Sequence, residues 1–107
     1  MKDLGDAYLN LTKGDPQTNL EGAIAFYQSA QKVYTEEHHP VEWAKIQNNL
    51  GIAYSKLTKG DRRDNLNAAI NCYQAALQVF NSQHMDNHIQ SANSNLSKAQ
   101  QELHKIS

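Results

Sequence analysis

The sequence predicts an all-α fold of antiparallel helical hairpins that stack side by side as an α-solenoid and end in a C-terminal capping helix. Three observations lead to this prediction. The chain repeats itself at an offset of 46 residues, apolar residues in each copy recur three or four positions apart, and only two prolines and five glycines interrupt its 107 residues. Apolar spacing of three and four is typical of one face of a helix. A period between 20 and 50 residues is typical of stacked repeats.

The repeat is strong enough to divide the chain. Residues 4–37 align with residues 50–83 without a gap, and 17 of the 34 aligned pairs are identical. A third, degenerate copy follows at about residues 86–105, where the glycine and tyrosine of the earlier copies become Ser97 and Gln100. A terminal repeat needs such a polar face because nothing stacks beyond it. The predicted organisation is one domain, 1–107, made of repeat one at 1–37, repeat two at 38–83 and a capping helix at 84–107.

Five helices are expected, with ends uncertain by ~2–4 residues. Their ranges are roughly 2–12, 19–36, 41–58, 65–82 and 87–105. The first begins in the middle of its repeat, so we expect the chain to be an excerpt of a longer array or protein. The second follows Gly14 and the turn residues Asp15-Pro16, with Thr18 or Asn19 as its N-cap.

The later helices have similar signals at their ends. Pro40 suits the first turn of the third helix, and Gly60 suits its C-terminus. Asp64 or Asn65 is the expected N-cap of the fourth. Because the connections between consecutive helices are short, neighbouring helices should run antiparallel.

Two motifs in the middle copy, and again in the first, carry a resemblance to a known family. In the middle copy they are Leu50, Gly51 and Tyr54 on one helix, and Ala69, Tyr73 and Ala76 on the next. This pattern resembles the tetratricopeptide repeat (TPR), a helix-turn-helix unit whose usual length is about 34 residues. The longer period here looks like the long-repeat variants found in bacterial signalling and regulatory proteins. Glycine and alanine let helix backbones approach closely, while the aromatic ring fills the space between them.

The resemblance implies a protein–protein interaction module that binds a peptide or protein segment in a concave groove. Amide side chains suit a peptide backbone because they both donate and accept hydrogen bonds. The groove residues carried over are Lys45, Asn48, Asn49, Ile52, Ser55 and Lys56 on the middle hairpin, Asp6, Leu9 and Asn10 on the first helix, and Lys98 on the capping helix. The competing interpretation is that these positions are ordinary solvated helix surface.

A second function remains open beside peptide binding. The chain could be a structural or self-assembly element that stacks with copies of itself or with flanking repeats, because exposed apolar ends of a solenoid favour association. The clamp with which some TPR proteins hold chaperone C-termini is not expected. Asp6 stands where that clamp needs an asparagine, and Ser91 and Asn95 replace two of its cations.

Composition argues against several other classes. A net charge of −1 provides no field to attract nucleic acid or an anionic membrane, and no apolar run is long enough to span a bilayer. No acid pair, nucleophile with its base, or ligand cluster is visible, so we expect neither an enzyme nor a cofactor. His84 and His88 have helical spacing but are expected to be solvated rather than metal-binding. The single Cys72 fits a small buried residue and a cytoplasmic protein.

Overall fold

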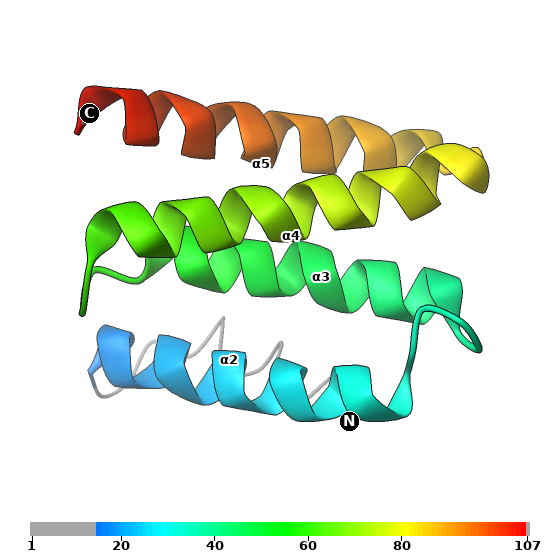
Figure 1. The fold of residues 1–107 in the computed structure, drawn as a ribbon, viewed down its shortest axis with the longest axis horizontal. Coiled ribbons are helices and arrows are strands. Elements are labelled where there is room, and N and C mark those ends of the chain that lie inside the picture. The colour runs from blue at the N-terminus through cyan, green and yellow to red at the C-terminus, as the bar shows by residue number, and fades with distance from the viewer. Residues whose placement is uncertain (1–14, 107) are drawn as a thin grey trace.

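The computed structural model describes residues 15–106, and this part of the chain is built from helices joined by short connections, with no strand (Figure 1). The helices are α2 (Pro16–Val33), α3 (Pro40–Lys56), α4 (Arg62–Ser82) and α5 (Asp86–Lys105). The all-α fold class is confirmed. The expected helix at 2–12 lies outside the described residues. No helix in residues 15–106 is long and apolar enough to cross a membrane.

The helices lie side by side in the order in which they follow one another along the chain (Figure 1). Consecutive helices run in opposite directions, so that α3 and α4 form one hairpin and α5 returns along α4. Each helix packs mainly on its neighbours in the sequence, and α3 also touches α5. The result is a slab of about 34 × 31 × 20 Å.

Two aspartates at equivalent positions of the repeat start α2 and α4. Asp15 Oδ1 accepts a hydrogen bond from the Gln17 amide at 3.1 Å, and Asp61 Oδ1 accepts one from the Asp64 amide at 3.1 Å. The predicted N-caps were therefore wrong by three or four residues. A capping carboxylate satisfies an amide that has no partner within the helix, and Pro16 can follow because the first helical position needs no donor. The same proline position is confirmed for α3, which begins at Pro40.

Two helices end earlier than expected. α2 ends at Val33 rather than near residue 36, and α3 ends at Lys56 rather than near residue 58. Gly60 is thus not at the helix end but in the connection that follows, with a φ of 80°. Nothing lies within 4 Å of a Cβ placed on it, so glycine is favoured here by its backbone angle and not by space.

The core repeats with the sequence. Between α2 and α3, Ala23 and Tyr27 pack with Leu50 and Ala53. Between α4 and α5, residues 46 positions further along take the same places, so that Ala69, Tyr73 and Ala99 share a cluster with Leu96 packed against it. A third cluster joins the starts of α3 and α5 to the end of α4, and its buried members are Ala44, Ala76, Leu77, Val79, Phe80 and Ala92. The packing of α2 on α3 therefore recurs as that of α4 on α5.

One close approach fixes the α3–α4 hairpin. The Tyr73 ring, 1% exposed, lies so near Gly51 that a Cβ on this glycine would stand 2.5 Å from Tyr73 Cε1. A real Cβ does not approach a carbon atom so closely. The sequence motif that pairs a glycine on one helix with an aromatic residue on the next is explained by this contact.

Candidate functional site

A pocket of about 440 Å³ opens between α3 and α5, over the N-terminal half of α4. Its lining comes from three helices that the hairpin order brings together. The residues are Ile52, Ser55 and Lys56 from α3, Leu66 and Tyr73 from α4, and Asn95, Lys98, Ala99 and Glu102 from α5.

Four of the predicted groove residues share this pocket: Ile52, Ser55, Lys56 and Lys98. The other three on α3 lie nearer the start of that helix and do not line it; they are Lys45, Asn48 and Asn49, all half-buried. Asp6, Leu9 and Asn10 lie outside the described residues. The pocket therefore brings together predicted residues from two helices and leaves out those nearer the start of α3.

Asn48 differs from the other predicted residues in its surroundings. Its Oδ1 atom is buried and accepts no hydrogen bond within the part of the chain that the structure describes. A buried amide oxygen without a donor costs free energy. Asn48 does not line the pocket, so this buried oxygen is a separate feature of α3.

The floor of the pocket is well packed. Leu66 and Tyr73 are each 1% exposed, and the Tyr73 hydroxyl donates to Ser55 Oγ at 3.5 Å. Ser55 in turn donates to the Ile52 carbonyl at 2.8 Å. Burial raises the pKa of the Tyr73 phenol, although the hydrogen bond with Ser55 opposes the shift. The Tyr73 phenol therefore stays neutral, and the Ser55 hydroxyl proton is donated to a backbone carbonyl of α3.

Residues from α4 and α5 complete the site, and sequence reasoning did not include them among the groove positions. Asn95, Lys98, Ala99 and Glu102 are related by steps of three and four residues, which is the spacing of one helix face. That spacing could have identified them. Leu66 and Tyr73 are buried core residues that also form the floor of the pocket.

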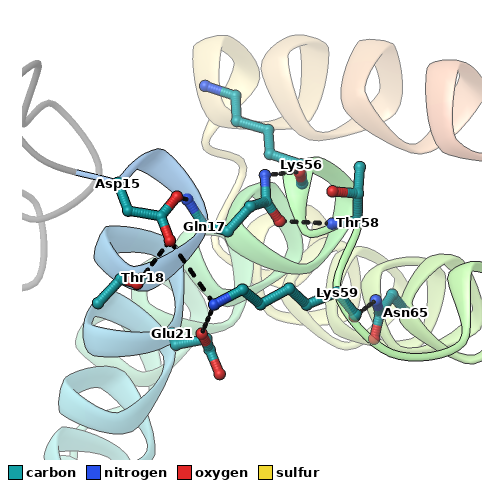
Figure 2. A network of polar contacts seen from close by, with 8 residues as sticks. All are labelled: Asp15, Gln17, Thr18, Glu21, Lys56, Thr58, Lys59 and Asn65. Atoms are coloured by element: carbon teal, nitrogen blue, oxygen red, sulfur yellow. Dashed lines mark hydrogen bonds and ion pairs between the residues drawn. The ribbon is translucent and has the colours of Figure 1, made fainter.

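A polar network holds the C-terminal end of α3, where Lys56 leaves the helix (Figure 2). The Gln17 side chain, from the start of α2, accepts a hydrogen bond from the Thr58 amide at 2.7 Å and donates to the Lys56 carbonyl at 3.5 Å. Asn65 donates to the Lys59 carbonyl at 2.9 Å from the other side. These bonds satisfy backbone groups that a helix end leaves without partners.

An ion-pair group lies beside these bonds (Figure 2). Lys59 Nζ is 3.3 Å from Glu21 Oε1 and 3.6 Å from Asp15 Oδ2. The pKa of the Lys59 amine is raised, mainly by Glu21, and the pKa of the Asp15 carboxyl is lowered, mainly by its hydrogen bond with Thr18. All of these groups are exposed, so they orient the connection more than they stabilise the fold.

The same tie between helices recurs one repeat later. Arg63, 46 residues after Gln17, donates from Nη2 to the Ile106 carbonyl at 2.9 Å. A side chain near the start of α2 and another near the start of α4 thus reach the backbone at the end of the following helix. The pocket walls α3 and α5 are therefore both fixed at their C-terminal ends.

Two of the histidines make aromatic contacts, and one of them, His88, was expected to be solvated but is half-buried in α5. His88 lies with its ring centroid 5.0 Å from that of Phe80, and His39 lies 5.4 Å from Tyr34. His84 precedes α5 as expected, with a φ of 57°. No group of three potential metal ligands from His, Cys, Asp and Glu occurs within residues 15–106.

Cys72 lies half-buried on α4 and packs against the cluster formed by α2 and α3. Burial raises the pKa of its thiol to about 11, from an ordinary value of 9.0. Between pH 9 and pH 11 the unfolded chain loses this proton while the folded chain keeps it, so the free energy of unfolding should fall as the pH rises through this window. The expected loss is roughly 2 kcal/mol by pH 11.

Urea unfolding of the wild type and of Cys72→Ala from pH 8 to pH 11 measures this effect. The variant lacks the thiol but keeps every tyrosine and lysine, so only the difference between the two pH profiles reports on Cys72. Parallel profiles would show that the thiol ionises equally in both states.

Comparison with protein-family models, with curated proteins and with solved structures finds no match to this chain. The resemblance to the TPR family therefore depends on the chain's own residues.

Proposed function

We propose that this chain is a TPR-like interaction module that binds a peptide or protein segment in the groove between α3 and α5. The observation that carries the proposal is the pocket shared by Ile52, Ser55, Lys56 and Lys98. The family resemblance assigned these four residues to a groove from two separate helices, and they line one concavity. Concave sites with a few polar groups at the rim are where proteins commonly bind ligands.

The proposed architecture is a short solenoid with α5 as its cap. It is supported by the packing of α2 on α3, which recurs 46 residues later in that of α4 on α5. The ties made by Gln17 and Arg63 repeat at the same interval. Every exposed residue of α5 is polar, as suits a helix on which no further repeat stacks.

We propose binding rather than catalysis at this site. Ser55 is the lining residue with an aliphatic hydroxyl, and its proton is donated to a backbone carbonyl instead of to a base. An activated nucleophile needs an adjacent base. The partner is a protein segment rather than nucleic acid, because the chain's net charge is −1.

Selection from a random peptide library displayed on phage, with the full chain immobilised, tests this function. A groove of this size should give peptides that bind with Kd values of about 1–100 μM. Ile52→Glu should weaken those peptides at least about tenfold, because it places a charge where an apolar contact is expected. Gln78→Glu, an exposed change on α4 outside the pocket, is the matched control and should leave binding unchanged.

Circular dichroism should show equal helicity for both variants before binding is compared. Peptides that bind Ile52→Glu as tightly as the wild type would contradict the assignment of the groove. Failure to select any specific peptide would contradict the binding function itself.

A further inference from the structure

The geometry points to a partner segment that places an aspartate or glutamate side chain between Lys56 and Lys98, next to an apolar residue on Ile52. This inference rests on the proposed function and adds the chemical class of the partner. Three features of the pocket lead to it: two lysines that make no ion pair within residues 15–106, a glutamate that pairs with a cation outside the pocket, and an apolar floor that is almost fully buried.

The two lysines stand on opposite walls. Lys56 comes from α3 and Lys98 from α5, and both are exposed. Neither makes an ion pair within the described residues, where the paired lysines are Lys59 and Lys105. In Figure 2 the Lys56 side chain extends away from the network that holds its backbone. Two unmatched positive charges at one pocket favour an anionic group between them.

The acidic residue of the pocket does not cancel this charge. Glu102 Oε1 lies 3.2 Å from Lys105 Nζ, one turn further along α5. Lys105 does not line the pocket, so the ion pair is directed along the helix. The Glu102 carboxylate is thus paired with a cation outside the pocket. The net charge of the side chains that line the pocket remains positive, even though the net charge of the whole chain is −1.

The apolar floor offers little new area to a ligand. Leu66 and Tyr73 are each 1% exposed and Ala99 is 2% exposed, whereas Ile52 is half-buried and retains surface to cover. Burial of apolar area contributes in proportion to the area removed from water. Contact between one apolar side chain of the partner and Ile52 can therefore contribute to the binding free energy. The charges of Lys56 and Lys98 then decide which segments bind.

Asn95 supplies the remaining polar contact. It is half-buried in the α5 wall, one turn before Lys98. Its amide can both donate to and accept from a peptide backbone. The two lysines and this amide all belong to side chains along the groove. They therefore suit the carboxylate of an Asp or Glu side chain within the partner segment, and they do not require the partner's C-terminal carboxylate.

Titration of the isotope-labelled full chain with three synthetic peptides, followed by two-dimensional NMR, tests the inference. The first is an acetylated and amidated nine-residue peptide of alternating Glu and Leu. The second has Gln in place of each Glu. The third is the Gln peptide with a free C-terminal carboxylate. The end groups of the first two remove terminal charges, so that only the side chains differ.

The Glu peptide should shift the amide signals of Ile52, Lys56, Asn95 and Lys98 and should bind about tenfold more tightly than the Gln peptide at low salt. Raising the NaCl concentration to 0.5 M should remove most of this preference, because exposed charges are screened. Lys56→Gln and Lys98→Gln should each weaken the Glu peptide about two- to fivefold. Lys32→Gln removes an exposed charge from α2 and should change nothing.

Equal binding of the Glu and Gln peptides at the pocket would overturn the inference while leaving the groove as a binding site. Shifts caused by the third peptide but not by the first would overturn the assignment to a side-chain carboxylate. The absence of any shift at the four residues would overturn the inference too. The proposed function has its own test in the random-library selection, so the two failures can be told apart.

Discussion

Replacing Tyr73 by alanine should lower the free energy of unfolding by about 3–5 kcal/mol, the range found when large aromatic side chains are removed from protein cores. Tyr73 is 1% exposed and packs between α3, α4 and α5. Its ring covers Gly51, and its hydroxyl reaches Ser55. Domains of this size are stable by about 5–15 kcal/mol, so the variant should lose a large part of its stability.

Chemical denaturation followed by circular dichroism measures this loss. Tyr34→Ala is the matched control, since Tyr34 is only half-buried at the end of α2. It should cost clearly less. A Tyr73→Ala variant that is as stable as Tyr34→Ala would show that the packing of α3 on α4 does not depend on this ring.

Replacing Gly51 by alanine should also destabilise the fold, by about 1–3 kcal/mol. On an exposed helix the same change would stabilise by roughly 1 kcal/mol, because alanine has the better helix propensity. Here the new methyl group would lie 2.5 Å from Tyr73 Cε1 and 2.7 Å from Cδ1. The ring is buried and cannot swing into solvent, so α3 and α4 must move apart.

A double-mutant cycle with Tyr73→Leu tests the cause of that loss. Once the ring is gone, Gly51→Ala should become neutral or stabilising, with a coupling energy of about 1–3 kcal/mol. An equal penalty in both backgrounds would mean that the methyl group meets something other than the ring.

Much of this fold could be predicted from the sequence because both copies of the repeat contain the same packing residues. Tyr27 and Tyr73, 46 residues apart, both proved to be buried, as the spacing of apolar residues indicated. The predicted starts of α2 and α4 were wrong because Asp15 and Asp61, which lie before the predicted helices, proved to be their N-caps. A carboxylate before a helix can be either a turn residue or a cap. Local sequence does not distinguish the two, and hydrogen-bond geometry does.

The candidate site was predictable in part. Ile52 and Lys98 were expected in one groove although 46 residues separate them. What the sequence could not give was the length of the lined segment. How far the groove extends along α3 depends on the angle between neighbouring helices, and that angle follows from the whole of the packing. Lys45 and Asn49 therefore fell outside the pocket although they match groove positions.

The order of the helices in space, which equals their order in the chain, has a kinetic consequence. Each helix packs mainly on its neighbours in the chain, so the core can grow by closing one short connection at a time. Closing short loops costs little entropy, and chains dominated by such local contacts fold quickly. Local opening should begin at α2 or α5, because each of them has one extensive neighbour within the described residues, whereas α3 and α4 each have two. Opening at α5 would remove one wall of the pocket.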